Sequence, residues 1–115
     1  MYQNQLYLYW NIGKHAFENK DRCINPIEKY SNYYSYRFGN SYLFTRNRIR
    51  MMILFYLTFP IFFKQMENIS WNQYMLLLNI EDKKERYFYF YLSLFFHSDY
   101  QETKDFIFND YYFRI

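Results

Sequence analysis

Cysteine, glycine and histidine are scarce in this chain. A single cysteine, Cys23, excludes an intrachain disulfide and any cysteine cluster that could hold a metal ion. Two glycines leave little room for a glycine-rich loop around a cofactor phosphate. The two histidines, His15 and His97, have no companion at the spacing of metal ligands. The sequence therefore predicts no metal site, no cofactor and no small-molecule substrate.

Catalytic patterns are missing as well. The chain has no Ser-His-Asp order and no paired acids at a useful helical spacing, so we expect it not to be an enzyme and to carry no catalytic residue. Glu102-Thr103-Lys104 matches an ExK pattern, with Asp82 or Asp99 upstream. In nucleases such carboxylates lie on adjoining strands and hold a divalent cation. Because Glu102 follows a predicted helix cap, we interpret the tripeptide as a chance match.

Neither a membrane span nor a signal peptide is visible. Residues 51–63 are the most apolar stretch, but Thr58 and Pro60 interrupt it. The stretch is shorter than the roughly 20 residues that cross a bilayer. The first ten residues are polar and aromatic, without a basic start and a smooth apolar run. We therefore expect a cytoplasmic protein without a membrane partner.

Aromatic residues are abundant instead. They make up 28% of the chain, with 16 Tyr and 14 Phe, and apolar residues reach 51%. This apolar content favours a folded protein, and 115 residues suit one domain over residues 1–115. Exposed aromatics can stack on nucleic acid bases. Since the aromatics are spread through every segment, a compositional bias that fills core positions is the favoured interpretation.

Apolar residues recur at helical rather than strand spacing, which predicts an all-α bundle of about five helices. Gly13 falls on the apolar stripe of the first helix, where its main use would be close approach of another helix. The predicted helices, in chain order, are residues 2–19, residues 27–38 after an Asn25 cap, a helix from the Thr45 cap to Pro60, a helix capped by Ser70, residues 86–96 after a charged break at 81–85, and a last helix capped by Ser98.

Residues 37–60 resemble the turn and second helix of a helix-turn-helix unit. Gly39, Asn40 and Ser41 form a dense turn signal. The helix after Thr45 has one apolar face and one polar face. The apolar face comprises Ile49, Met52, Ile53 and Tyr56, whereas Arg46, Asn47 and Arg50 project from the other side and Arg48 lies on the flank.

The net charge of +3 is concentrated around this unit. Between Lys29 and Met66 the sequence contains bases and no acid. The bases are Lys29, Arg37, Arg46, Arg48, Arg50 and Lys64. Such a surface suits a phosphate backbone. The alternative is a solvated basic face, or one paired with the acidic C-terminal third of the chain.

The order of these elements resembles the N-terminal domain of the YhcG family, once called domain of unknown function 1016. The elements that carry the resemblance are Tyr9-Trp10-Asn11-Ile12-Gly13-Lys14, Phe38-Gly39, the Thr45 cap with Arg46, Ile49 and Met52, Phe55-Tyr56 with Phe59-Pro60, Ser70-Trp71-Asn72-Gln73-Tyr74 with Leu77, and Arg86 with Tyr89. The resemblance implies an all-helical, winged-helix-like domain that precedes a PD-(D/E)xK nuclease domain and contacts DNA. We expect that nuclease domain to be absent here, because the chain ends at Arg114-Ile115.

Together these features predict a non-catalytic DNA-binding module that contacts mainly the phosphate backbone. The predicted contact residues are Arg37, Arg46, Asn47, Arg48, Arg50 and Lys64. Two alternatives remain: a protein-interaction or oligomerisation domain, and a remnant of a truncated nuclease. Under the first alternative the partner would be a second copy of the chain or a separate nuclease subunit.

Overall fold

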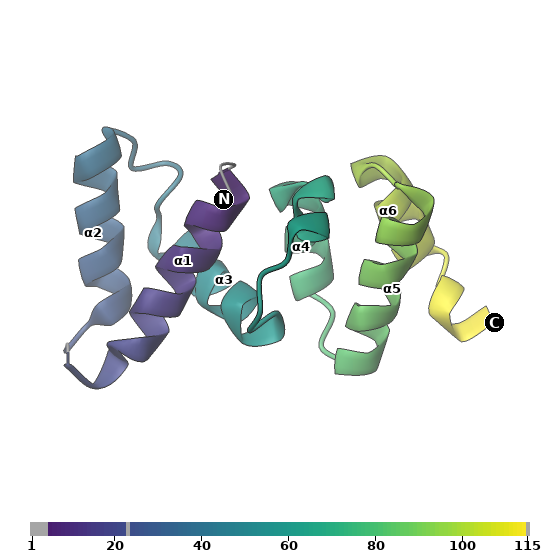
Figure 1. The fold of residues 1–115 in the computed structure, drawn as a ribbon, viewed down its shortest axis with the longest axis horizontal. Coiled ribbons are helices and arrows are strands. Elements are labelled where there is room, and N and C mark those ends of the chain that lie inside the picture. The colour runs from purple at the N-terminus through teal and green to yellow at the C-terminus, as the bar shows by residue number, and fades with distance from the viewer. Residues whose placement is uncertain (1–4, 23, 115) are drawn as a thin grey trace. The chain divides into compact units, whose positions relative to one another are not determined.

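The computed structural model describes residues 5–22 and 24–114, and the regular structure in these residues is entirely helical. Cys23 lies outside the described residues. The described residues form six α-helices and three short 3-10 helices, in the order α1 (Gln5–Glu18), η1 (Lys20–Arg22), α2 (Pro26–Phe38), α3 (Arg46–Thr58), η2 (Lys64–Asn68), α4 (Trp71–Leu78), α5 (Lys83–Phe96), α6 (Tyr100–Phe108) and η3 (Tyr111–Arg114) (Figure 1). The predicted all-α class is confirmed, with six helices rather than about five.

The helices form two compact units. Among the described residues, the first unit spans residues 5–62 and contains α1 to α3, and the second spans residues 63–114 and contains α4 to α6. No described helix combines the length and the apolarity needed to cross a bilayer. The assignment of residues 1–115 to a single domain stays a prediction.

In the first unit, α1 packs against α3 at a very close crossing (Figure 1). Gly13 makes this crossing possible, because a Cβ atom at this position would overlap the backbone carbonyl of Met52. Trp10 adds a buried hydrogen bond, in which its indole Nε1 donates to the carbonyl oxygen of Phe59 at 2.7 Å. The predicted role of Gly13 in close helix packing is confirmed.

The buried face of α3 differs slightly from the predicted one. Ile49 and Met52 are fully buried, as predicted, and so is Phe55. Ile53 and Tyr56 are only partly buried. Phe55 lies one turn beyond Met52 on the same side, so the core face of α3 runs through these three residues.

The connection between α2 and α3 is fixed by local hydrogen bonds. Gly39 ends α2 in the left-handed conformation, with φ of 63°. The N–H groups of Gly39 and Asn40 donate to the carbonyls of Tyr36 and Ser35, as in a Schellman motif. Thr45 caps α3 by accepting from the Arg48 N–H at 3.2 Å. The predicted turn and cap are therefore present.

The helix-turn-helix assignment itself stays a prediction. Residues 39–45 separate α2 from α3, whereas a helix-turn-helix usually has a turn of about 3–4 residues. Any winged-helix likeness is limited to the helices in the described residues, since none of these residues lies in a strand.

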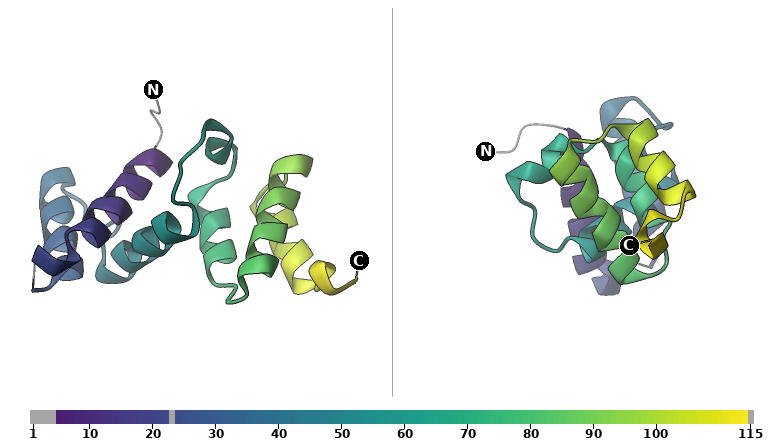
Figure 2. Two further views of the ribbon diagram at one scale, coloured as in Figure 1. Left: turned by 60° about the horizontal axis from the view of Figure 1, so that its bottom comes forward. Right: turned by 90° about the vertical axis from the view of Figure 1, so that its right-hand side faces the viewer.

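In the second unit, α4 starts at a reciprocal cap. Ser70 Oγ accepts from the Gln73 N–H, and Gln73 Oε1 accepts from the Ser70 N–H. The buried Gln73 amide then donates to the Ser98 carbonyl at 2.8 Å and to Thr103 Oγ1 at 3.0 Å. This network joins α4 to α6, while α5 and α6 lie side by side (Figure 2).

Two predicted boundaries in this unit are wrong. Helix α5 begins at Lys83 with Asp82 as its cap, so the predicted charged break at 81–85 contains the first turn of a helix. The cap of α6 is Asp99, not Ser98. The reason is that the N–H of Ser98 donates to the Ser93 carbonyl at 3.0 Å and closes the end of α5. Ser98 is therefore buried, and the next residue is left to start α6.

Candidate nucleic-acid interface

The start of α3 presents two exposed arginines. Arg46 is the first residue of the helix and Arg50 follows one turn later, so both side chains lie on one side of α3. The Asn47 side chain is exposed next to them. The structure therefore brings Arg46, Asn47 and Arg50 together on one surface of the first unit.

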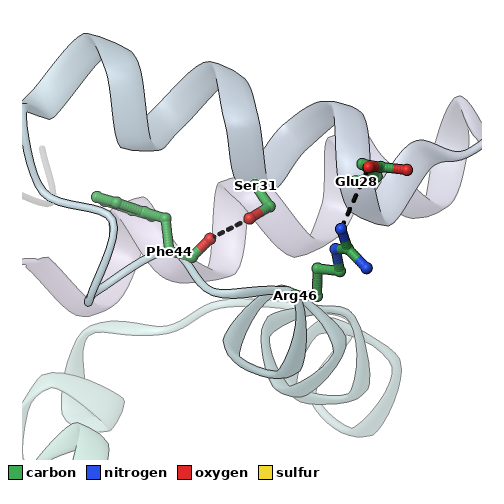
Figure 3. Close-up of polar contacts among 4 residues, drawn as sticks. All are labelled: Glu28, Ser31, Phe44 and Arg46. Carbon is green, nitrogen blue, oxygen red and sulfur yellow. Dashed lines mark hydrogen bonds and ion pairs between the residues drawn. The ribbon is translucent and has the colours of Figure 1, made fainter.

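Arg46 contacts the neighbouring helix through an ion pair. Its Nη2 lies 3.2 Å from Oε1 of Glu28 in the first turn of α2 (Figure 3). Both side chains are largely exposed, at 64% for Arg46 and 46% for Glu28. Exposed ion pairs contribute only about 0–1 kcal/mol. A ligand with greater charge density can therefore replace Glu28 at little cost.

The two helix starts enclose a small hollow of about 200 Å³. Its lining consists of Asn25, Pro26, Ile27, Glu28, Arg46 and Arg50. Asn25 occupies the N-cap position predicted for it, but its side chain makes no capping hydrogen bond. The positive end of the α2 dipole thus opens on the hollow, beside two guanidinium groups. These features suit a phosphate oxygen, which accepts charge-assisted hydrogen bonds.

Close by, a buried hydrogen bond holds α2 on the connection to α3. Ser31 is the only buried residue of α2, and its hydroxyl donates to the Phe44 carbonyl at 2.6 Å (Figure 3). The Phe44 ring stacks on Tyr34 and Phe38 near the other end of α2. These contacts fix α2 against the residue that precedes the Thr45 cap of α3.

Arg48 has a different environment from the other arginines of α3. Its Nε donates to the Leu43 carbonyl at 2.9 Å, and its guanidinium lies 5.8 Å from the centre of the Tyr9 ring. The side chain is half-buried and connects α3 with α1 and with the preceding loop. These contacts point to a structural role, on the flank where the sequence pattern had placed it.

Neither Arg37 nor Lys64 lines this hollow. Arg37 is exposed in the last turn of α2, nine residues after Glu28, which corresponds to about 14 Å along a helix axis. Burial raises the pKa of nearby Tyr34, and the positive charge of Arg37 opposes this rise. Lys64 opens η2 and belongs to the second unit. Within the first unit, the structure therefore brings Arg46, Asn47 and Arg50 together and leaves Arg37 at the other end of α2.

Sequence reasoning missed Glu28 and the start of α2 as parts of this surface. Glu28 and Arg46 are 18 residues apart, so no helical spacing could have paired them. The N-cap pattern Asn25-Pro26 was the available signal, because it marked where a helix start would lie.

The acids considered for a nuclease site are engaged in a helix cap. Asp99 Oδ1 accepts from the Glu102 N–H at 2.8 Å, and Glu102 Oε1 accepts from the Asp99 N–H at 3.1 Å. Thr103 between Glu102 and Lys104 is buried. Within residues 5–22 and 24–114, no three His, Cys, Asp or Glu side chains lie close enough to share a metal ion.

Comparison with known proteins gives one family match. The family model described as DUF1016 N-terminal domain matches residues 2–114. No curated protein and no solved structure matches the chain.

Proposed function

The chain belongs to the DUF1016 N-terminal domain family, and on this premise we propose that it is a non-catalytic DNA-binding module. In this proposal, the start of α3 holds the phosphate backbone. The observation that carries it is the convergence of Arg46 and Arg50 on the hollow at the start of α2. Two guanidinium groups around one hollow can bind neighbouring phosphate oxygens, and Asn47 beside them can reach a base edge.

Binding of DNA would exchange one anion for another at Arg46. The phosphate replaces Glu28, whose exposed ion pair holds the guanidinium only weakly. Two phosphates neutralised by Arg46 and Arg50 would contribute about −1.8 to the slope of log K against log salt concentration. Most of the affinity would therefore be independent of DNA sequence.

The test compares two double variants by fluorescence anisotropy with a labelled DNA duplex over a range of salt concentrations. Arg46→Ala with Arg50→Ala is expected to weaken binding and to reduce the salt slope by about 2. The matched control is Lys83→Ala with Lys84→Ala, which removes two exposed positive charges from α5. Equal weakening by both variants would show that only net charge matters, and unchanged binding of the arginine variant would refute the proposal.

Glu28→Gln provides a second test with the opposite sign. The amide keeps the shape of the side chain but no longer competes with phosphate for Arg46. We expect duplex binding to tighten by about 2- to 5-fold, the effect of weakening one exposed ion pair. Weaker binding of this variant would mean that Glu28 holds Arg46 in its binding position.

A further inference from the structure

One side of α5 carries an open apolar surface, distinct from the arginine surface. Six side chains line a broad, shallow region on the surface of this helix. They are Phe88, Tyr91, Leu92, Leu94, Phe95 and Phe96, named here the α5 face. Phe95 is 77% exposed, and Tyr91 and Phe96 are each more than half exposed.

Only part of the α5 face is used within the second unit: the Phe88 ring packs against Tyr111 and Tyr112 of η3, and the Phe96 ring against Phe106 of α6. Helix α5 buries Tyr89, Phe90 and Ser93 within the unit. On this inner side, Ser93 Oγ shares a hydrogen bond with Thr103 Oγ1 at 3.0 Å. The α5 face lies around the rest of the helix, so α5 is apolar on more than one side. From Tyr87 onward the helix is apolar on most sides, a pattern typical of a helix that is buried all round.

We propose that the α5 face binds the same face of a second copy of the chain. Phe88, Tyr91, Leu92 and Phe95 follow the spacing i, i+3, i+4 and i+7, which forms a continuous seam for helix–helix packing. In a dimer with twofold symmetry, this seam packs against the same seam of the second chain, because an isologous contact uses the same patch of both chains. If the two copies of α5 pack antiparallel, their helix dipoles point in opposite directions, which is the favourable orientation.

The exposed area matches a small dimer interface. A buried aromatic side chain covers about 150–250 Å², so Tyr91, Phe95 and Phe96 together expose about 400 Å². With the three partly exposed side chains, Phe88, Leu92 and Leu94, the whole face exposes about 500 Å² per chain, so two chains can bury at most about 1,000 Å², the size of a weak or transient interface. The expected complex is therefore a weak dimer with a dissociation constant in the micromolar range.

The chemistry of the α5 face favours a second copy over nucleic acid. No charged side chain is among the six lining residues. A polyanion would find no cation to bind there. Two identical apolar faces, in contrast, bury no unpaired charge when they meet. This inference is independent of the proposed DNA contact, because that contact uses residues of the first unit and the α5 face belongs to the second.

Sedimentation equilibrium over about 1–200 µM full-length chain covers the range expected for such an interface. The average mass should rise from one chain to two. Phe95→Glu should keep the protein monomeric, raising the dissociation constant about 100-fold or more, because a carboxylate would be buried without a partner. Circular dichroism checks that this exposed substitution leaves the helix content unchanged.

The matched control is Phe108→Glu, the same substitution at a 70% exposed phenylalanine of α6 outside the α5 face. This variant should still dimerise. Tyr91→Lys places the opposite charge on the α5 face and should also abolish the dimer. A wild-type chain that stays monomeric throughout, a mass above two chains, or a dimer that survives Phe95→Glu would overturn the proposal.

Discussion

Replacement of Gly13 by alanine tests the packing of the first unit most directly. A Cβ atom at this position would overlap the Met52 carbonyl and would lie 3.0 Å from the Ile53 amide nitrogen. Carbon atoms in ordinary contact are about 3.5–4.0 Å apart. Because the atoms in the way belong to the α3 backbone, no change of rotamer can relieve the overlap. The two helices must move apart.

Two opposing terms set the size of the effect. Alanine stabilises a helix by about 1 kcal/mol relative to glycine. Overpacking a core usually costs about 1–3 kcal/mol and sometimes more. Since the clash involves rigid backbone, the upper end of that range applies, and we expect Gly13→Ala to lower the free energy of unfolding by about 2 kcal/mol.

Urea and thermal unfolding followed by circular dichroism would measure this loss. For a unit of this size, a loss of about 2 kcal/mol corresponds to a fall of roughly 10 °C in the midpoint. The control is Gly39→Ala, where a Cβ atom meets nothing within 4 Å and only the positive φ opposes the change. That variant should lose about 1 kcal/mol, and Gly39→Asn should recover part of it. Unchanged or increased stability of Gly13→Ala would refute the close crossing of α1 and α3.

Three further predictions concern polar groups. Gln73→Leu should lower the free energy of unfolding by about 2–3 kcal/mol in urea titrations, because Ser98 and Thr103 lose a buried donor. Burial raises the pKa of Tyr74 above the usual value of about 10. Its contribution to stability is therefore complete below pH 10 and falls above it, by up to about 1.4 kcal/mol per pH unit, and Tyr74→Phe should flatten this part of the pH–stability curve. Arg48→Leu should cost about 1 kcal/mol of stability through its lost hydrogen bond, whereas the exposed Arg46 should tolerate leucine without a measurable change.

Local signals in the sequence predicted much of the first unit. Gly39 and Thr45 determine backbone geometry through their own atoms and their nearest neighbours, so the end of α2 and the start of α3 were predictable. Gly13 was also informative, because a glycine on an apolar helical stripe has few uses other than close packing.

Features that depend on distant neighbours were not predictable in the same way. Ser98 and Asp99 are both good helix caps by residue type, and only the way α5 ends decides between them. The environment of Arg48 could not be predicted for the same reason. Arg48 turned toward Leu43 and Tyr9 because loop and helix packing placed an acceptor and a ring beside it.

The pairing of Glu28 with Arg46 makes the chain its own competitor for the arginine surface. The Glu28 carboxylate lies beside the Arg46 guanidinium, in the place that an external anion would take. A solute with a single weak charge would gain little by replacing Glu28 at Arg46, whereas a polyanion such as DNA would gain more in the proposed contact. In the proposed DNA contact, the ligand must displace this carboxylate before it binds Arg46, which favours ligands that carry several negative groups.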